Sequence, residues 1–180
     1  MGSEDVYKRQ EIGKLTDNKT LKVYVPGMGN GHDAAFFAQH GHQTIGGDLS
    51  EKAVENAQTK YQTLDLIDFQ VLDAIHNENP KEIDLVFDRA MFCALPASIE
   101  NLYLESCAKK LKKTGIFASV LFTKVDSENG PPWEIPVEDF SLKMNKLGFE
   151  LAFRQDIPVT YKSTFILHES VVIFMRSIIF

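Results

Sequence analysis

A glycine-rich turn between two apolar segments constrains this chain more than any other feature. Residues Val23–Asp33 read VYVPGMGNGHD, an apolar run followed by Gly27, Gly29 and Gly31, and a second apolar run ends at Asp48. Glycines let the backbone of such a turn approach a ligand closely, and an acid at the end of the next strand accepts hydrogen bonds from ribose hydroxyls. The pair predicts an α/β fold with a pocket for a nucleoside cofactor.

The spacing of the glycines separates two classes of cofactor. A dinucleotide fingerprint needs a further glycine three positions after the second one, so that helix and strand pack tightly beneath a pyrophosphate. Here that position is His32. The GxGxG spacing instead resembles the first motif of class I S-adenosylmethionine (SAM) methyltransferases, which hold no pyrophosphate. An ordinary strand-to-helix turn is the alternative for the glycines alone, and Asp48 favours the cofactor.

Composition and charge limit the classes of protein to which this chain can belong. Its 180 residues with 44% hydrophobic content suffice for one domain with its own core. A formal net charge of -6 argues against a nucleic-acid surface, because phosphate binding depends on clustered lysine and arginine. No apolar run has the length of a membrane span, and no signal peptide is visible. We therefore expect a cytoplasmic protein that acts on a small molecule, as a monomer or weak homodimer, without a nucleic-acid or membrane partner.

The side chains that most often bind metals form no recognisable pattern. Cys93 and Cys107 are too few for a disulfide framework or a zinc site, which also indicates a reducing compartment. The five histidines lack the spacing of metal ligands. His32 lies in the glycine turn, where we expect it to pack or cap rather than act as a base. The sequence thus predicts no metal site.

Strand and helix signals alternate along the chain, which predicts a parallel sheet with helices on both faces. The expected strands are Leu21–Pro26, Thr44–Asp48, Phe69–Leu72, Ile83–Asp88, Ile116–Thr123, Phe149–Gln155 and Ser170–Met175. The expected helices are Asp33–His40, Ser50–Tyr61, Ser98–Lys113 and Val137–Leu147. Because no helix separates the last two strands, they should pair antiparallel. The expected fold is α/β, with a mostly parallel seven-stranded sheet that ends in an antiparallel hairpin.

One basic cluster stands out in this acidic chain, at Lys109, Lys110, Lys112 and Lys113. It closes the third expected helix, where positive charge interacts favourably with the negative end of the helix dipole. We therefore interpret the cluster as a solvated helix face rather than as a phosphate-binding site.

Two further acids follow strands of the expected sheet. Asp73 comes after the third strand, and Asp88 ends the fourth and is followed by Arg89. In open α/β sheets, ligands bind at the carboxyl ends of the strands. These residues are therefore candidates for the same pocket as the glycine turn. A turn cap at Asp73 and a surface ion pair at Asp88 and Arg89 are the simpler alternatives.

Two longer segments carry a resemblance to a known family of enzymes. They are Phe87–Pro96, FDRAMFCALP, and Asn129–Pro136, NGPPWEIP. With the glycine turn, they closely resemble the thiopurine methyltransferase family, including its halide and thiol methyltransferase branch, from Leu21 to Arg176. The resemblance implies the Rossmann-like class I methyltransferase fold, SAM as methyl donor and S-adenosylhomocysteine (SAH) as product. Residues 11–180 would then form a single SAM-dependent methyltransferase domain.

The resemblance also implies roles for individual residues. The cofactor would be bound by Gly27, Met28, Gly29, Gly31, Asp33, Asp48, Leu49, Asp73, Ala74 and Asp88. Asp88 and Arg89 would lie near the sulfonium in catalytic roles. The acceptor would be bound by Arg89, Phe92, Pro131, Pro132 and Trp133. The prolines suit a pocket wall, because a pre-set backbone loses less entropy when it closes over a ligand.

The implied chemistry is methyl transfer from a sulfonium to a small soft nucleophile, namely a thiol, sulfide, halide or thiopurine-like acceptor. Such an in-line displacement needs alignment and desolvation more than proton removal, which agrees with the lack of a Ser/His/Asp or Cys/His arrangement. One alternative is transfer to an oxygen or nitrogen of a small metabolite, which would usually use a base near Asp88 or His32. Another is a fragment that binds SAM or SAH with little turnover. A nicotinamide-dependent dehydrogenase is a more distant alternative.

The first ten residues, MGSEDVYKRQ, differ in character from the rest of the chain. The segment Asp5–Gln10 can be back-translated into the end sequence of a transposon that is used in making sequencing libraries. We therefore expect residues 1–10 to be artefactual or disordered, in a metagenomic sequence with a truncated N-terminus. Since members of the resembled family carry a longer segment there that folds over SAM, this truncation would favour the weakly active fragment.

Overall fold

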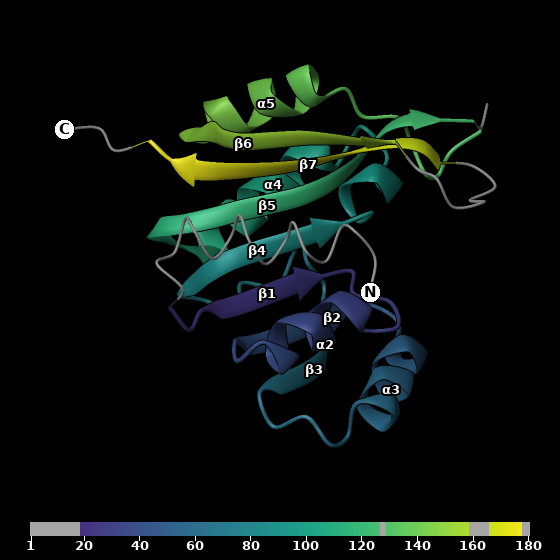
Figure 1. Cartoon of the computed structure of the whole chain (residues 1–180), viewed down its shortest axis with the longest axis vertical. Coiled ribbons are helices and arrows are strands. Elements are labelled where there is room, and N and C mark those ends of the chain that lie inside the picture. Colours follow the sequence, from purple (N-terminus) through teal and green to yellow (C-terminus); the bar gives the residue numbers. More distant parts are fainter. Residues whose placement is uncertain (1–18, 127–128, 159–165, 178–180) are drawn as a thin grey trace.

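Seven strands form one sheet in the order β3-β2-β1-β4-β5-β7-β6. They are β1 (Lys22–Pro26), β2 (Gln43–Asp48), β3 (Ile67–Val71), β4 (Ile83–Arg89), β5 (Leu111–Val125), β6 (Phe149–Pro158) and β7 (Ile166–Arg176). This computed structural model describes residues 19–126, 129–158 and 166–177, so the expectation for residues 1–10 lies outside the described residues. The strands β1 to β5 pair in parallel, and β7 pairs antiparallel with both β5 and β6 (Figure 1). The predicted mostly parallel sheet with an antiparallel C-terminal hairpin is confirmed.

Helices cover both faces of this sheet. They are α2 (His32–Gln39), α3 (Glu51–Lys60), α4 (Glu100–Lys110) and α5 (Val137–Lys146), with a short 3-10 helix, η1 (Phe92–Ala94). Phe37 of α2 and Val54 of α3 pack in one apolar core, while Tyr103 of α4 and Phe140 of α5 pack in the other. Along β1, β4 and β7, successive buried side chains enter opposite cores, as the period of a strand requires. Among the described residues, none of the helices combines the length and apolar character that a membrane crossing needs.

The local signals at the helix ends act as the sequence predicts. The Ser50 hydroxyl accepts a hydrogen bond from the Ala53 N–H at 3.2 Å, so α3 begins with a capping residue. Gly148 follows α5 with a φ of 79°, the left-handed conformation that ends a helix. These contacts confirm the predicted beginning of α3 and the predicted end of α5.

The helix predicted over Ser98–Lys113 is shorter, and the interpretation of its basic cluster is wrong. The chain becomes extended at Leu111, which pairs with Ile83 and begins β5. Lys112 therefore lies on a strand, with its Nζ 2.6 Å from Asp84 Oδ1. Lys110 is only 2% exposed. Pairing with β4 overrides the helical pattern here, and the cluster is not one solvated helix face.

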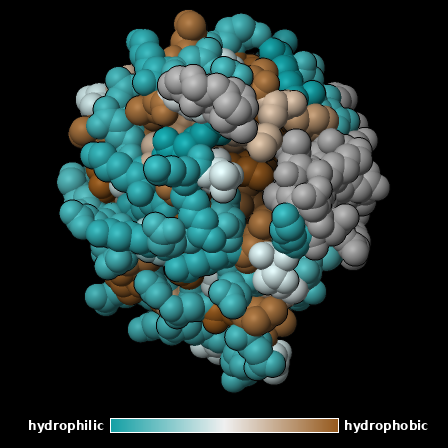
Figure 2. All heavy atoms as spheres, turned by 90° about the vertical axis from the view of Figure 1, so that its left-hand side faces the viewer, coloured by the Kyte–Doolittle hydropathy of each residue, from teal (hydrophilic) through white to brown (hydrophobic). Residues whose placement is uncertain are grey.

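The ends of the parallel strands define two opposite edges of the sheet. In Figure 1 the arrowheads of β1 and β4 point to the right, so the carboxyl edge of the sheet lies on that side. Figure 2 shows the other side, where β1 and β4 begin, and hydrophilic residues prevail there around a narrow hydrophobic band. Since ligands of open α/β sheets bind at the carboxyl edge, the functional site is to be sought on the right of Figure 1.

Candidate functional site

The glycine turn joins β1 to α2, and at two of its three glycines the surroundings leave no room for a side chain. Gly27, Gly29 and Gly31 have φ values of 58°, 53° and 74°, a left-handed conformation that favours glycine. A Cβ atom at Gly27 would lie 2.5 Å from the Met91 sulfur, and one at Gly31 would lie 2.8 Å from the Phe69 ring. A Cβ atom at Gly29 would meet nothing within 4 Å. Gly29 therefore marks the open side of the turn, where a ligand can reach the backbone.

Asp48, at the end of β2, is bonded to this turn. Its Oδ2 accepts a hydrogen bond from the Gly29 N–H at 2.9 Å, and its Oδ1 accepts one from the Ser50 N–H at 2.9 Å. The side chain of the next residue, Leu49, is 66% exposed. A carboxylate held by two amides beside an exposed apolar side chain fits a ribose and the flat face of a purine.

The other cofactor candidates of this turn lie close to it. The Met28 N–H donates to the Gly47 carbonyl at 3.1 Å, which joins the turn to β2. The Met28 side chain is buried. Asp33 is half-buried in the first turn of α2. The structure thus brings the candidates from β1, β2 and α2 together at one edge.

Asp73 begins the loop that follows β3. Its Oδ1 accepts hydrogen bonds from the N–H groups of Ile75 at 2.8 Å and His76 at 3.0 Å, and its Oδ2 lies 2.8 Å from His76 Nδ1. Burial alone would raise the pKa of Asp73, but the hydrogen bonds from His76 and Ile75 outweigh it and lower the pKa. The interpretation of Asp73 as a turn cap is therefore correct. A contact of Asp73 and Ala74 with adenine stays a prediction.

Asp88 lies beneath the site, with none of its surface exposed. Its Oδ2 accepts hydrogen bonds from the Tyr103 hydroxyl at 2.6 Å and from the Phe92 N–H at 3.2 Å. Burial raises the pKa of Asp88 to about 6, because a carboxylate removed from water is costly, while these two hydrogen bonds oppose the rise. In this arrangement the carboxylate faces donors of the protein, and its catalytic contact with the cofactor stays a prediction.

The chain turns sharply after Arg89. Ala90 has a φ of 66°, which is uncommon for a residue other than glycine, and Met91 then lies against Gly27. The Arg89 side chain is 30% exposed, and its Nη2 lies 3.8 Å from Oε1 of the buried Glu169 on β7. Phe92 is fully buried and packs edge-on against Phe140, with 4.8 Å between the ring centres. Of these two predicted acceptor-binding residues, Arg89 is thus the one that reaches the surface.

The Gly-Pro-Pro-Trp loop, residues 130–133, is attached to the segment that follows Asp88. The backbone N–H of Trp133 donates to the Cys93 carbonyl at 2.6 Å, and the Cys93 sulfur accepts from the backbone N–H of Phe122 at 3.3 Å. Trp133 itself is 42% exposed. The structure therefore brings the two resemblance-bearing segments side by side, although they are far apart in the sequence. Their contact with an acceptor stays a prediction.

Gly130→Ala should displace the Trp133 ring, because a Cβ atom at this position would overlap the ring. Trp133 is the only tryptophan of the chain, so intrinsic fluorescence reports on it alone. We expect a red-shifted emission, stronger quenching by acrylamide and a loss of about 1–3 kcal/mol of stability. Gly148→Ala is the control, since Gly148 has a φ of 79° and no neighbour within 4 Å of an added Cβ atom. It should lower stability without changing the emission, and unchanged emission in Gly130→Ala would contradict the loop geometry.

Three polar residues behind the site were not recognised in the sequence. The sequence alone indicates no role for Tyr103 or Ser106, and it places Lys110 in a basic cluster interpreted as a solvated helix face. The only local signal is a polar group at a helix position that faces the core. Within the described ranges, no group of three or more His, Cys, Asp or Glu side chains comes together to hold a metal.

Sequence relatives of this chain carry names of one kind. A family model described as Thiopurine S-methyltransferase (TPMT) matches residues 7–163. "Probable thiol methyltransferase 2" of Arabidopsis thaliana is 32% identical over 143 residues, which are 78% of this chain and 62% of that protein. "Thiopurine S-methyltransferase" of Legionella pneumophila (strain Corby) is 28% identical over 148 residues, which cover 73% of this chain and 67% of that protein. The chain thus spans less than two thirds of the length of the Arabidopsis relative.

Solved structures share the fold at low sequence identity. Magnesium protoporphyrin IX methyltransferase from Synechocystis PCC 6803, with bound SAM, has a TM-score of 0.76 at 17% identity and covers 97% of this chain and 80% of its own. A SAM-dependent methyltransferase from Methanosarcina mazei has a TM-score of 0.80 at 14% identity and covers 93% of this chain and 97% of its own. The likeness confirms the predicted class I methyltransferase fold.

Proposed function

Because the chain belongs to the thiopurine S-methyltransferase family, we propose that it binds SAM and transfers its methyl group to a small soft nucleophile. Enzymes of this family are SAM-dependent methyltransferases of the thiol and thiopurine type, and SAM is their cofactor. One observation carries the proposal for this chain. The Asp48 carboxylate is fixed to the Gly29 N–H at 2.9 Å, beside the open side of the glycine turn and the exposed Leu49.

The residues present fit SAM at the carboxyl edge of the sheet. The turn from Gly27 to Gly31 would pass beneath the methionine part, and Asp48 would accept hydrogen bonds from the ribose hydroxyls. Leu49 would cover one face of the adenine, and Asp73 and Ala74 would flank it. When bound, SAM supplies a methyl group that its sulfonium already activates. The protein then has to align the acceptor and exclude water.

A soft acceptor fits the charged groups near this edge. Arg89 is partly exposed beside the fourth strand end, and its guanidinium, which pairs with Glu169 at 3.8 Å, has further N–H donors that suit an anionic thiolate, hydrosulfide or halide. Asp88 is buried under Tyr103 and Phe92, so we propose that it supports the Arg89 turn from below. His32 lies 3.0 Å from the Tyr61 hydroxyl, at the start of α2. These placements favour an acceptor that reacts without a general base over an oxygen or nitrogen acceptor.

We also propose that residues 11–180 form a single methyltransferase domain that works in the cytoplasm as a monomer or weak homodimer. The single sheet with cores on both faces supports one domain. The formal net charge of -6 supports the proposal that the protein binds no nucleic acid. Within the described residues, the lack of a membrane-spanning helix is compatible with this location.

A panel of acceptors tests the proposed reaction. The full chain is incubated with SAM and iodide, hydrosulfide, a small thiol or a thiopurine, and with a phenol and an amine as controls, and the SAH formed is quantified by chromatography. We expect SAH with at least one soft acceptor and none with the phenol or amine. Transfer only to the phenol or amine, with a rate that rises through the histidine range of pH, would instead support the oxygen or nitrogen methyltransferase.

Calorimetric titration with SAH tests cofactor binding without turnover. Binding of SAH without methyl transfer to any acceptor would leave a SAM-binding protein that does not act on this panel. Tight binding of NADH with no binding of SAH would contradict the proposed cofactor and would support the nicotinamide-dependent dehydrogenase instead.

A further inference from the structure

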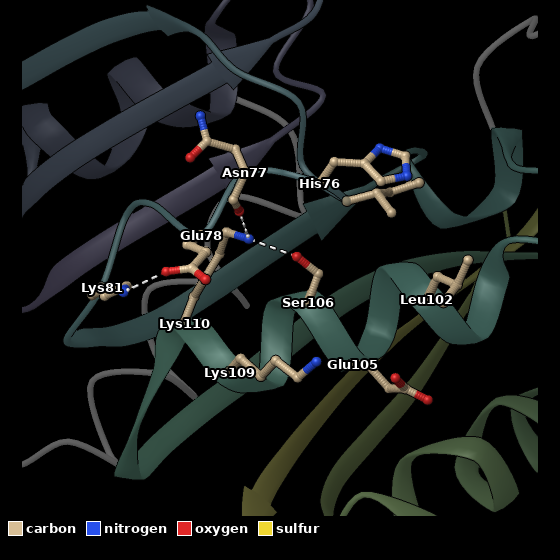
Figure 3. A pocket seen from close by; sticks show the side chains of 10 residues that line it. His76, Asn77, Glu78, Lys81, Leu102, Glu105, Ser106, Lys109 and Lys110 are labelled. Atoms are coloured by element: carbon tan, nitrogen blue, oxygen red, sulfur yellow. Dashed lines mark hydrogen bonds and ion pairs between the residues drawn. The ribbon is translucent and has the colours of Figure 1, made fainter.

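Lys110, the last residue of α4, is a buried lysine that holds the loop after β3. Only 2% of its surface is exposed. Its ammonium group donates to the carbonyls of Asn77 at 2.7 Å and Ala74 at 3.3 Å, and to the Ser106 hydroxyl at 2.6 Å. Figure 3 shows the bond to Asn77 reaching from the helix to the loop, and the bond to Ser106 lying within α4. All three acceptors are neutral, so the charge of Lys110 serves loop carbonyls and a hydroxyl.

The loop that Lys110 holds begins at one of the proposed cofactor contacts. The Asn77 N–H donates to the Asp73 carbonyl at 3.1 Å, which closes the turn from Asp73 to Asn77. The Ala74 carbonyl accepts a second hydrogen bond, from the Ser106 hydroxyl at 2.8 Å. The Asp73 carboxylate also accepts backbone hydrogen bonds within this turn. The carbonyls of Ala74 and Asn77 are therefore bonded to α4, and Asp73 is joined to Asn77 through the closed turn.

Among the described residues, apolar packing supports this loop on its inner side, where Ala74 and Ile75 contact a core cluster, but not on its outer side. A cavity of about 620 Å³ lies between the loop and α4, and Figure 3 shows side chains of both elements lining it. Leu102, which faces this cavity from α4, is 50% exposed. Since the cavity leaves a gap where side chains would otherwise pack, the polar bonds of Lys110 and Ser106 carry more of the loop's attachment.

Burying the charge of a lysine at this position costs free energy, so packing alone does not account for this residue. Burial lowers the pKa of Lys110, which shows that the surroundings disfavour its charge. A methionine of similar length would fill the space without that cost, but it would leave the carbonyls of Ala74 and Asn77 without this donor. What the lysine adds is therefore directional bonding to the loop.

We propose that Lys110 is a positioning residue for the adenine of SAM, which holds the Asp73–Asn77 loop in the conformation that meets the purine. The inference rests on the proposed binding of SAM at the carboxyl edge. It assigns no contact between Lys110 and the cofactor, because Lys110 acts through the backbone of Ala74 and Asn77. Ser106 belongs to the same arrangement through its bonds to Ala74 and Lys110.

Lys110→Met tests the proposal, with Lys109→Met as the matched control. The control removes the same charge from the neighbouring residue, whose side chain is exposed. We expect Lys110→Met to weaken the binding of SAH about tenfold or more, and Lys109→Met to leave it unchanged within about twofold. Affinities are measured by calorimetry on samples that remain folded by circular dichroism. Ser106→Ala is the milder second variant and should shift the affinity in the same direction.

A comparison of two ligands separates positioning of the adenine from a general loss of structure. S-inosylhomocysteine differs from SAH in the purine, where a carbonyl replaces the amino group. The wild-type protein should prefer SAH, and Lys110→Met and Ser106→Ala should reduce this preference towards equal affinity. An equal loss for both ligands, with the preference retained, would overturn the inference and leave the proposed function intact. If the wild-type protein binds neither ligand, the proposed function fails as well.

Discussion

Asp48→Ala should weaken the binding of SAH by about a hundredfold or more. The variant removes the acceptor for the N–H groups of Gly29 and Ser50, both at 2.9 Å, and the proposed acceptor for the ribose hydroxyls. Hydrogen bonds to a charged group contribute about 1.5–3 kcal/mol each, and about 1.4 kcal/mol is a tenfold change in affinity. Two or more such bonds therefore account for the expected loss, which calorimetric titration measures directly.

Two further variants show which property of Asp48 matters. Asp48→Asn keeps the size of the side chain and one oxygen acceptor, so we expect an intermediate loss of about tenfold. Glu51→Gln removes an exposed carboxylate from the first turn of α3 and controls for the change in net charge near the site. An affinity of Asp48→Ala within about threefold of the wild-type value would place the cofactor elsewhere.

The position of this site could be predicted because its signals are local in the sequence. The glycine turn follows its own strand directly, and the Ser50 cap lies three residues before its partner, Ala53. The carboxyl ends of parallel strands meet at one edge, so Asp48, Asp73 and Asp88 could be assigned to one region before any contact was known. Their side chains differ in exposure, however, and the alternation of apolar residues did not distinguish the buried Asp88 from the others.

The supporting residues could not be predicted, because their partners are distant in the chain. Tyr103 and Asp88 are 15 positions apart, and Lys110 and Ala74 are 36 apart. The pattern of a helix shows which face is buried but not which carboxylate or carbonyl lies across from it. The predicted end of α4 is wrong for the same reason, since Leu111 pairs with Ile83 on another strand.

Asp88→Asn should change how the stability of the protein depends on pH. Burial raises the pKa of Asp88 from 3.8 to about 6 in the folded chain, so the folded chain holds this proton more tightly than the unfolded chain does. The contribution of this group to stability is therefore present below about pH 4 and is lost as the pH rises through about 6. The variant lacks that loss. Its free energy of unfolding relative to the wild type should rise by about 2 kcal/mol from pH 4 to pH 8, as measured by urea denaturation.

Tyr103→Phe tests the cause of this pH dependence. It removes the hydroxyl that donates to Asp88 Oδ2 at 2.6 Å and stabilises the charged form, so the pKa of Asp88 should rise further and the transition should move to higher pH. Glu150→Gln, on β6, controls for the loss of one exposed carboxylate. A difference in the free energy of unfolding between Asp88→Asn and the wild type that stays constant from pH 4 to 8 would show that this carboxyl group is not buried as described.

If the predicted catalytic role of Asp88 requires its charge, methyl transfer by the wild type should also fall below about pH 6, because the carboxyl group is then protonated.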